Sequence, residues 1–309
     1  MQLARVHGEL QMKWHVAALV ALLIVGCGKH QEETYQPTFS PRGPDAPREY
    51  IVGIYPLQNP KGLVESYGPV IDYFNIAIPQ AHFRLEASRN YEEFEKKLYS
   101  GHFDFAMPNS YQTVRSLKYG YRVFGKIGDD DKFRGIILVR KDSGIRKVTD
   151  LKGKKVCYPA LTAMAATIMP QYFLSTHGID VNRDIENIYV GSQESSIMNV
   201  LRGHVAAGGT WTVPWRVFVQ ENPEMAAQLE VKWQTRLLLN NSWVVRDDVL
   251  PTLAEKVGFA LVGLSKTAEG RAMLKKMGIN HFEHAENETY KPVQHFLKVF
   301  SETVRPVDY

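Results

Sequence analysis

Two turns near the middle of the chain carry the residue types of a small-anion site. The apolar run 156–159 is followed by Thr162 and then, from Ala163, by good helix formers, so a hydroxyl residue stands where a helix begins. Residues 191–196 repeat this arrangement after a second apolar run. A helix N-terminus offers backbone N–H groups and partial positive charge to an oxyanion. Two such ends at the carboxyl ends of strands predict an anion pocket.

The sequence shows no recognisable catalytic motif. There is no His-Glu-x-x-His pattern, no Gly-x-Ser-x-Gly nucleophile elbow and no phosphate loop ending in Gly-Lys-Ser/Thr. His281 and His284 fall in a polar loop between predicted helices and lack a further candidate ligand. Cys157 has no adjacent His that would form a thiolate. We therefore expect a protein that is not an enzyme and uses no cofactor or metal.

Composition narrows the class of partner. With 309 residues the chain is long enough for two α/β domains, and its 44% hydrophobic and 23% charged residues are ordinary for a globular protein. The formal net charge of +4 is mild, and no run of Lys and Arg reaches the density of a nucleic-acid-binding patch. We expect no nucleic-acid partner.

The N-terminus has the pattern of a secretory signal. Lys13 precedes an apolar run at 16–25 that is too short to span a bilayer comfortably. The run ends in Val25-Gly26-Cys27, which resembles the bacterial lipobox and implies cleavage before Cys27 and lipidation of that residue. An uncleaved anchor, or a cysteine that merely ends a signal peptide, are the alternatives. Met12 is a more typical signal start than Met1.

Residues 27–48 are predicted to be a lipidated cysteine followed by an extended tether, because they are rich in Pro and polar residues and almost lack aliphatic ones. A lipid anchor, an extended tether and a globular part together predict a protein held at the periplasmic face of a bacterial membrane or at the cell surface. The sequence leaves the choice between inner and outer membrane open. Cys157, the other cysteine, lies in a predicted buried strand, where it is expected to act as a small apolar residue.

Beyond the tether, strands alternate with helices. Strand-like runs are predicted at 50–55, 82–87, 103–107, 121–127 and 135–140, and helices at 67–74 and 91–99. This alternation predicts a parallel sheet in an α/β fold. The Asp129-Asp130-Asp131 run is predicted to be a solvated turn, and only helices are predicted after residue 245.

The order of these elements predicts two lobes. Lobe 1 is expected to comprise residues 49–139 and 237–309, with residues 140–236 inserted as lobe 2. Two extended crossings between such lobes form a hinge and place a ligand cleft at strand ends.

The chain resembles a known family at several runs. These are residues 103–108 (FDFAMP), 136–143, 150–156 (DLKGKKV) and 191–194 (GSQE). In order and spacing, residues 50–250 are similar to the phosphate/phosphite/phosphonate-binding proteins of ABC importers. The resemblance implies an α/β type II periplasmic-binding-protein clamshell with two hinge crossings. It also implies that a monomer delivers a small oxyanion to a membrane permease.

The resemblance also implies a ligand shell drawn from both lobes. Lobe 1 would supply Tyr55, Ser110 and Tyr111, with Phe133 near the outgoing crossing. Lobe 2 would supply the Thr162 hydroxyl, the backbone N–H groups of Ala163 and Met164, and the residues Gln193, Glu194, Thr210 and Trp211. Packing in the core is the alternative for Tyr55, Tyr111, Trp211 and Trp215, and stabilisation of a helix dipole is the alternative for Glu194.

The departures from the family pattern leave the ligand open. The family cradle is rich in Ser and Gly, whereas this turn sets Ala160, Leu161, Ala163 and Met164 around one hydroxyl. The run 205–211 has no carboxylate where the family often has Asp. A binder of another oxyanion, such as an arsenic species, is therefore one alternative. A sensor subunit that binds the ectodomain of a membrane kinase is another, because transport and sensing both use surfaces formed on cleft closure.

Overall fold

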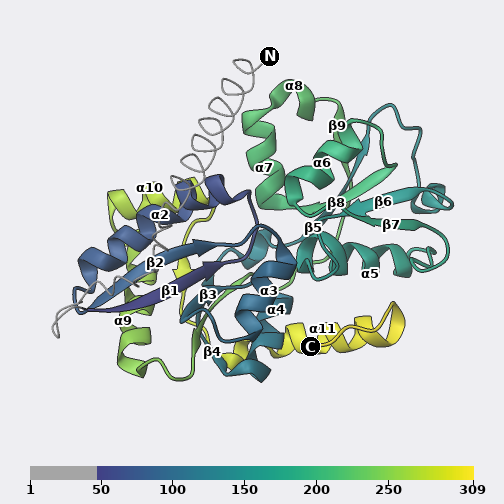
Figure 1. Cartoon of the computed structure of the whole chain (residues 1–309). Helices are drawn as coiled ribbons and strands as arrows, with labels where there is room; N and C mark the ends of the chain where they lie inside the picture. Colours follow the sequence, from purple (N-terminus) through teal and green to yellow (C-terminus); the bar gives the residue numbers. More distant parts are fainter. Residues whose placement is uncertain (1–46) are drawn as a thin grey trace, which may run out of the picture. The chain divides into compact units, whose positions relative to one another are not determined.

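The chain folds into two mixed β-sheets flanked by helices (Figure 1). This computed structural model describes residues 47–309, which form one compact unit. The predicted signal peptide, Cys27 and nearly all of the predicted tether lie outside the described residues. Within the described part, the α/β class expected from the sequence is confirmed.

The first sheet has six strands in the order β11-β4-β10-β3-β1-β2. Its strands are β1 (Arg48–Ile54), β2 (Ala81–Ala87), β3 (Phe105–Met107), β4 (Tyr121–Ile127), β10 (Ser242–Arg246) and β11 (Phe282–Glu283). The helices of this part are α2 (Pro60–Ala77), α3 (Tyr91–Tyr99), α4 (Ser110–Ser116), α9 (Pro251–Gly263), α10 (Ala268–Met277) and α11 (Lys291–Thr303). Strand β1 runs parallel to β2 and β3, whereas β10 runs antiparallel to β3 and β4. The prediction of a parallel sheet was therefore wrong for the strand that returns from the second sheet.

The second sheet has five strands in the order β7-β6-β8-β5-β9. Its strands are β5 (Gly135–Arg140), β6 (Lys155–Tyr158), β7 (Glu186–Tyr189), β8 (Ala207–Trp211) and β9 (Leu229–Gln234). Its helices are α5 (Met169–Thr176), α6 (Gln193–Leu201), α7 (Thr212–Glu221) and α8 (Pro223–Ala226), and a π-helical turn, η4 (Met164–Ile168), leads into α5. Short 3-10 turns lie at Leu117–Tyr119, Asp130–Lys132, Val148–Leu151, Leu264–Lys266 and Asn287–Tyr290.

Two chain crossings, residues 128–134 and 235–241, connect the sheets and run side by side. The Leu238 amide donates to the Phe133 carbonyl at 3.1 Å, and the Thr235 amide donates to the Gly135 carbonyl at 2.9 Å. Strand β5, which the sequence-based division placed at the end of lobe 1, pairs with β8 and β9 in the second sheet. The rest of that division stays a prediction.

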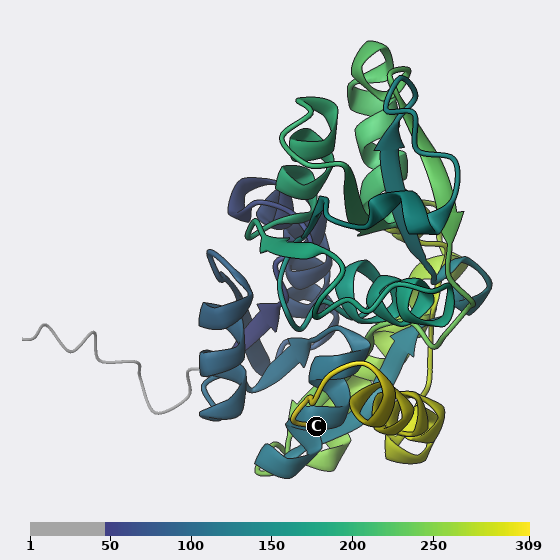
Figure 2. The ribbon, with the colours of Figure 1, turned by 90° about the vertical axis from the view of Figure 1, so that its right-hand side faces the viewer.

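Helix α11 contacts both halves of the molecule, and Figures 1 and 2 both show it beside them. It packs on α4 of the first half, and the Phe296 ring meets the Tyr172 ring of α5 edge-on at 5.2 Å. Beyond the helix, Arg305 Nε donates to Gln171 Oε1 at 2.9 Å, and Arg115 pairs with the Asp308 carboxylate at 2.8 Å. The end of the chain therefore connects the two halves a third time.

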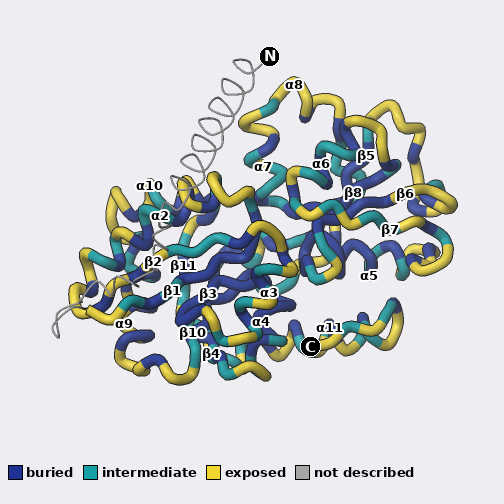
Figure 3. Tube along the Cα trace, viewed as in Figure 1, coloured by how far each residue is buried: buried dark blue, intermediate teal, exposed yellow. Residues whose placement is uncertain are grey.

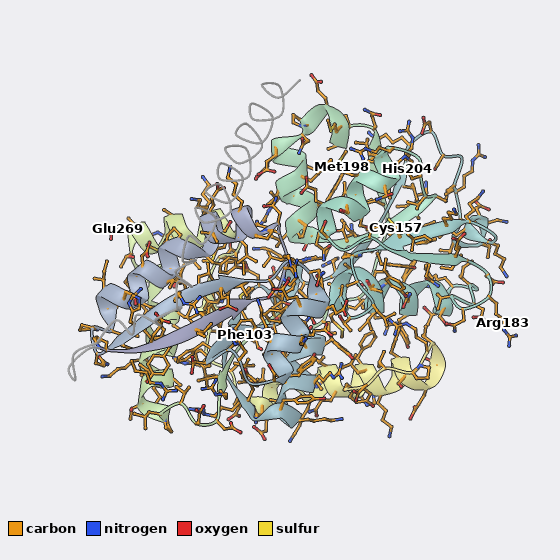
Figure 4. The ribbon with its side chains drawn as sticks, viewed as in Figure 1. Phe103, Cys157, Arg183, Met198, His204 and Glu269 are labelled. Atoms are coloured by element: carbon orange, nitrogen blue, oxygen red, sulfur yellow. The ribbon has the colours of Figure 1, made fainter. Side chains whose placement is uncertain are left out.

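Aromatic rings fill the core of the first sheet. Phe83 packs edge-on against Phe74 at 5.6 Å and against Phe105 at 5.7 Å, and Phe74 meets Trp243 at 6.2 Å. Each such pair contributes about 0.5–1.5 kcal/mol beyond its buried area. Figure 3 shows the strands of the sheets as mostly buried, with exposed residues concentrated on the outer helix faces. The labelled side chains of Phe103 and Cys157 mark the two halves in Figure 4.

Two local expectations were wrong because tertiary contacts prevail there. Asp129 does not lie in a solvated turn: it is 5% exposed, and its Oδ2 accepts the Asn280 amide at 2.7 Å. Asp130, beside it, pairs with Lys126 at 2.6 Å. The run around His281 forms the short strand β11, which pairs with β4, and is not a loop between helices.

Two glycines let the π-helical turn approach the second sheet. A Cβ atom on Gly209 of β8 would collide with the Ala166 carbonyl oxygen, and one on Gly135 of β5 would collide with the Ala165 carbonyl oxygen. Side chains at these two positions would push η4 away from the strand ends. The glycines therefore fix where the N-terminus of the turn stands.

Gly209→Ala is expected to destabilise the fold by about 1–3 kcal/mol, because the added methyl group meets backbone that cannot move independently. Urea unfolding followed by circular dichroism measures this loss. The matched control is Gly68→Ala in α2, where the added methyl group meets nothing within 4 Å. That change should be neutral or stabilising. Equal losses in the two variants would contradict the close-approach argument.

Candidate functional site

A cavity lies between the two halves of the fold, at the carboxyl ends of strands from both sheets. Its volume is about 10 Å³, which is room for about one water molecule. Its lining residues are Tyr55, Tyr91, Asn109, Phe133, Ala163, Met164, Ala165, Ala166, Gln193, Trp211 and Asn241. The two halves are thus closed tightly on each other.

Helix N-termini from both halves converge on this cavity. Tyr91 and Gln193 are the first residues of α3 and α6, Asn109 is the N-cap of α4, and Met164 opens η4. The first N–H groups of a helix have no acceptor within it and carry the positive end of its dipole. No Asp, Glu, Lys, Arg or His is among the described lining residues. The cavity is therefore favourable to an anion through neutral dipoles.

The Tyr91 hydroxyl is held by a chain of hydrogen bonds. Thr210 Oγ1 donates to Gln193 Oε1 at 2.8 Å, and Gln193 Nε2 donates to the Tyr91 hydroxyl at 3.2 Å. Because that hydroxyl already accepts a hydrogen bond from Gln193, its own proton is available to a ligand. Burial raises the pKa of Tyr91 far above its usual value, so the donor keeps its proton at neutral pH.

Tyr55 is held in a similar way from the second crossing. Asn241 Nδ2 donates to the Tyr55 hydroxyl at 3.0 Å, and the rings of Tyr55 and Tyr91 meet edge-on at 6.0 Å. Burial, followed by the neighbouring tyrosines, raises the pKa of Tyr55 well above its ordinary value. Two protonated hydroxyls thus border the cavity.

The remaining wall is apolar. Phe133 and Trp211 pack with their ring centroids 5.4 Å apart, and the opening residues of η4 bring only Ala and Met side chains. The Ala163 amide is already used, since it donates to the Ala160 carbonyl at 3.2 Å. Donors from this turn are therefore the backbone N–H groups of Met164, Ala165 and Ala166.

The structure brings some of the predicted site residues to the cavity and leaves others away from its wall. Those that line it are Tyr55, Phe133, Ala163, Met164, Gln193 and Trp211. Thr210 acts on it only through Gln193, and Ser110 is buried without lining it. The Tyr111 hydroxyl donates to the Asp308 carbonyl at 2.6 Å. Glu194 lines a neighbouring groove of about 310 Å³ between α2 and α7.

Thr162 is placed differently from the cradle expected of it. Its hydroxyl donates to the Glu95 carboxylate of α3, and its carbonyl accepts from Asn109 Nδ2 at 3.2 Å. It does not cap the helix, since the N-cap is Ala163 and has no side-chain bond. Thr162 therefore joins the two halves beside the cavity. Its position follows from contacts across the cleft, which a local capping pattern does not encode.

Sequence reasoning missed the lining residues Tyr91, Asn109, Ala165, Ala166 and Asn241. A usable signal existed for two of them. They are Tyr91, which follows the N-cap Asn90, and Asn109, itself an N-cap; both N-caps lie in the short loop after a strand, the same pattern that identified the second-lobe turns. Asn241 carried no such signal, because it lies on a crossing and reaches the site only through the fold.

The described residues contain no group of three or more His, Cys, Asp and Glu side chains placed to hold a metal ion. Within the same range, no helix has the length and apolar character needed to cross a membrane. Cys157 is buried, and burial raises the pKa of its thiol to about 11.

Solved structures share this fold. A binding protein component of an ABC phosphonate transporter from Pseudomonas aeruginosa matches with a TM-score of 0.77 at 15% identity, covering 83% of this chain and 88% of its own. PhnD1 from Prochlorococcus marinus, solved with methylphosphonate, matches with a TM-score of 0.76 at 18% identity, covering 82% and 98%. A Xanthomonas citri protein solved with a chloride ion matches with a TM-score of 0.68 at 15% identity, covering 82% and 98%. These likenesses confirm the predicted two-lobed type II periplasmic-binding-protein fold.

The family follows from the sequence match. The model of the family described as ABC transporter, phosphonate, periplasmic substrate-binding protein matches residues 52–290. The chain belongs to this family, as the resemblance in its motifs predicted. Its class is thus that of the periplasmic substrate-binding proteins of ABC transporters.

The Glu95 carboxyl, which accepts from Thr162 across the cleft, should make stability depend on pH. Burial raises its pKa, although hydrogen bonds from Thr162 and Gln112 oppose the shift. Protonated Glu95 contributes to the stability of the fold. This contribution is fully present below the ordinary pKa of Glu and is lost as the pH rises through the raised pKa of Glu95 in the folded protein. Glu95→Gln, which stays neutral, should therefore be more stable than wild type at neutral pH and equal to it near pH 4, at about the ordinary pKa of Glu.

Glu93→Gln is the control, and its effect on stability at neutral pH should have the opposite sign. Hydrogen bonds from Arg89 and Lys97 lower the pKa of Glu93 to about 2, so Glu93→Gln should lose a little stability at neutral pH. Thermal melts of the two variants across this pH range make the comparison. A Glu95→Gln variant less stable than wild type at neutral pH would contradict the argument.

Proposed function

We propose that this protein captures a small phosphorus oxyanion (phosphate, phosphite or a phosphonate) in the cavity between its lobes and delivers it to an ABC permease. The observation that carries the proposal is the convergence of helix N-termini and two protonated tyrosine hydroxyls on a cavity without charged side chains. Membership of a phosphonate-transporter family and the methylphosphonate bound by a structural relative support the choice of ligand.

Binding in this cavity requires the lobes to part. The cavity has room for about one water molecule, which is smaller than a tetrahedral oxyanion, and residues from both halves line it. The crossings 128–134 and 235–241 are the segments about which the lobes would open. A ligand that contacts donors from both lobes stabilises the closed form, which the permease would recognise.

The ligand should raise the thermal stability of the protein by mass action. We expect phosphite, methylphosphonate, aminoethylphosphonate or phosphate, at about 100 times its Kd, to stabilise the protein by about 2.7 kcal/mol. A thermal-shift screen of a protein comprising residues 28–309, with arsenite and neutral organic ligands included, measures this. A shift with a neutral ligand and with no oxyanion would overturn the phosphorus proposal.

Variants locate the binding in the cavity. Tyr55→Phe and Tyr91→Phe should each weaken oxyanion affinity, because each removes a donor that faces the ligand. Loss of one such hydrogen bond to a charged group corresponds to about 1.5–3 kcal/mol, or roughly 10- to 150-fold in Kd. Tyr119→Phe, a change on a 40% exposed ring outside the cavity, is the matched control. Isothermal titration measures all three, and wild-type affinity in both cavity variants would place the site elsewhere.

We further propose that Cys27 is lipidated and holds the protein at the membrane through the tether. The lipobox-like run before Cys27 supports this. In a bacterial host, Cys27→Ala should move the protein from the membrane fraction to the soluble extracytoplasmic fraction and abolish incorporation of labelled palmitate. Cys157→Ala, which removes the other cysteine, is the control and should stay in the membrane fraction. A Cys27→Ala protein that still carries palmitate would contradict the anchor.

A further inference from the structure

Asn241 holds an unused hydrogen-bond acceptor at the cavity. The residue lies on the second crossing and is 1% exposed, and its side chain borders the cavity. Its Oδ1 atom is buried and has no hydrogen-bond partner. A buried acceptor without a partner costs stability, so its persistence at a binding cavity calls for a ligand that satisfies it.

The other polar groups of Asn241 all have partners. Its amide N–H donates to Asn240 Oδ1 at 2.8 Å, and its carbonyl accepts the Ile127 amide at 3.0 Å. Its Nδ2 atom donates to the Tyr55 hydroxyl at 3.0 Å. Because Nδ2 donates to Tyr55, Oδ1 is left without a partner on a residue that lines the cavity.

This acceptor contrasts with the donors around it. The Tyr55 and Tyr91 hydroxyls and the first N–H groups of η4 all suit a negatively charged oxygen. A carboxamide oxygen in the same cavity repels such an oxygen, whereas it accepts a hydrogen bond from a hydroxyl group on the ligand. The cavity therefore combines several donors with one acceptor.

We propose that Asn241 Oδ1 selects an oxyanion that still carries a proton: the singly charged form of a phosphonate, phosphite or phosphate, against unprotonated isosteres such as sulfonates. This inference rests on the proposed function, whose ligand class it narrows. The ligand's P–OH group donates to Oδ1, while its unprotonated oxygens accept from the tyrosines and the backbone. A sulfonate carries no proton there, so one of its oxygen atoms would face Asn241 Oδ1 without a hydrogen bond between them.

The experiment compares methylphosphonate with methanesulfonate, which is nearly isosteric. It is done by isothermal titration at mildly acidic pH, where methylphosphonate carries mainly one charge and one proton. Wild type should bind methylphosphonate at least about tenfold more tightly than methanesulfonate, since an unpaired buried acceptor rejects the analogue that lacks the donor. Asn241→Leu, of similar size and without the acceptor, should bring the two affinities to within about threefold of each other.

Two further variants separate selection from packing. Tyr55→Phe keeps Oδ1 but removes the hydroxyl that holds Nδ2, so the carboxamide is free to turn, and the variant should weaken both anions and lower their ratio. Asn241→Asp keeps an acceptor and adds charge, so it should weaken both anions and widen the ratio. If Asn241→Leu does not fold, the Asn241→Asp ratio decides: an unchanged or smaller ratio overturns the inference.

The outcomes also separate this inference from the proposed function. Equal affinity of wild type for both anions would overturn the role of Asn241 while leaving oxyanion binding intact. Retention of the full wild-type ratio in Asn241→Leu would do the same. Binding of neither anion, nor of phosphate or phosphite, would overturn the proposed function and this inference with it.

Discussion

A cavity that favours an anion without a charged side chain is the constraint on which the arrangement of both lobes depends. Without a lysine or arginine in its wall, favourable potential must come from oriented dipoles, which act only at short range and in fixed directions. That requirement explains why helices α3, α4, α6 and η4 all begin at the cavity. It also explains why the sheets meet through the carboxyl ends of their parallel strands.

Dipoles need rigid support, and the surrounding side chains supply it. Gln193 is held at its amide oxygen by Thr210 and in turn holds Tyr91, while Asn241 holds Tyr55. Gly135 and Gly209 remove the side chains that would keep η4 from the strand ends. Polar groups so fixed in a buried site interact more strongly than the same groups in water, because they need no reorganisation when an anion enters.

Contacts at the edge of the cavity also hold the two halves of the fold together. Thr162 meets Glu95 and Asn109 from the opposite lobe at the edge of the cavity, and α11 with the C-terminal residues joins both halves on another face. The closed form thus has stabilising contacts of its own besides those a ligand would add. At this contact, burial disfavours the charged form of Glu95, whereas the hydrogen bond from Thr162 favours it.

The sequence by itself determined the elements and the family. Alternating strand and helix patterns located β1, β2, β4, β5 and β6, and the turn at residues 191–196 marked the start of α6, because these signals depend on neighbours along the chain. Six of the residues expected at the site from the family resemblance line the cavity, among them Tyr55 and Gln193. Tertiary structure decided the rest. It brought Asn241 and Tyr91 to the cavity, turned Thr162 towards Glu95 and buried Asp129. Each of these positions depends on a partner far away in the sequence, which local patterns do not encode.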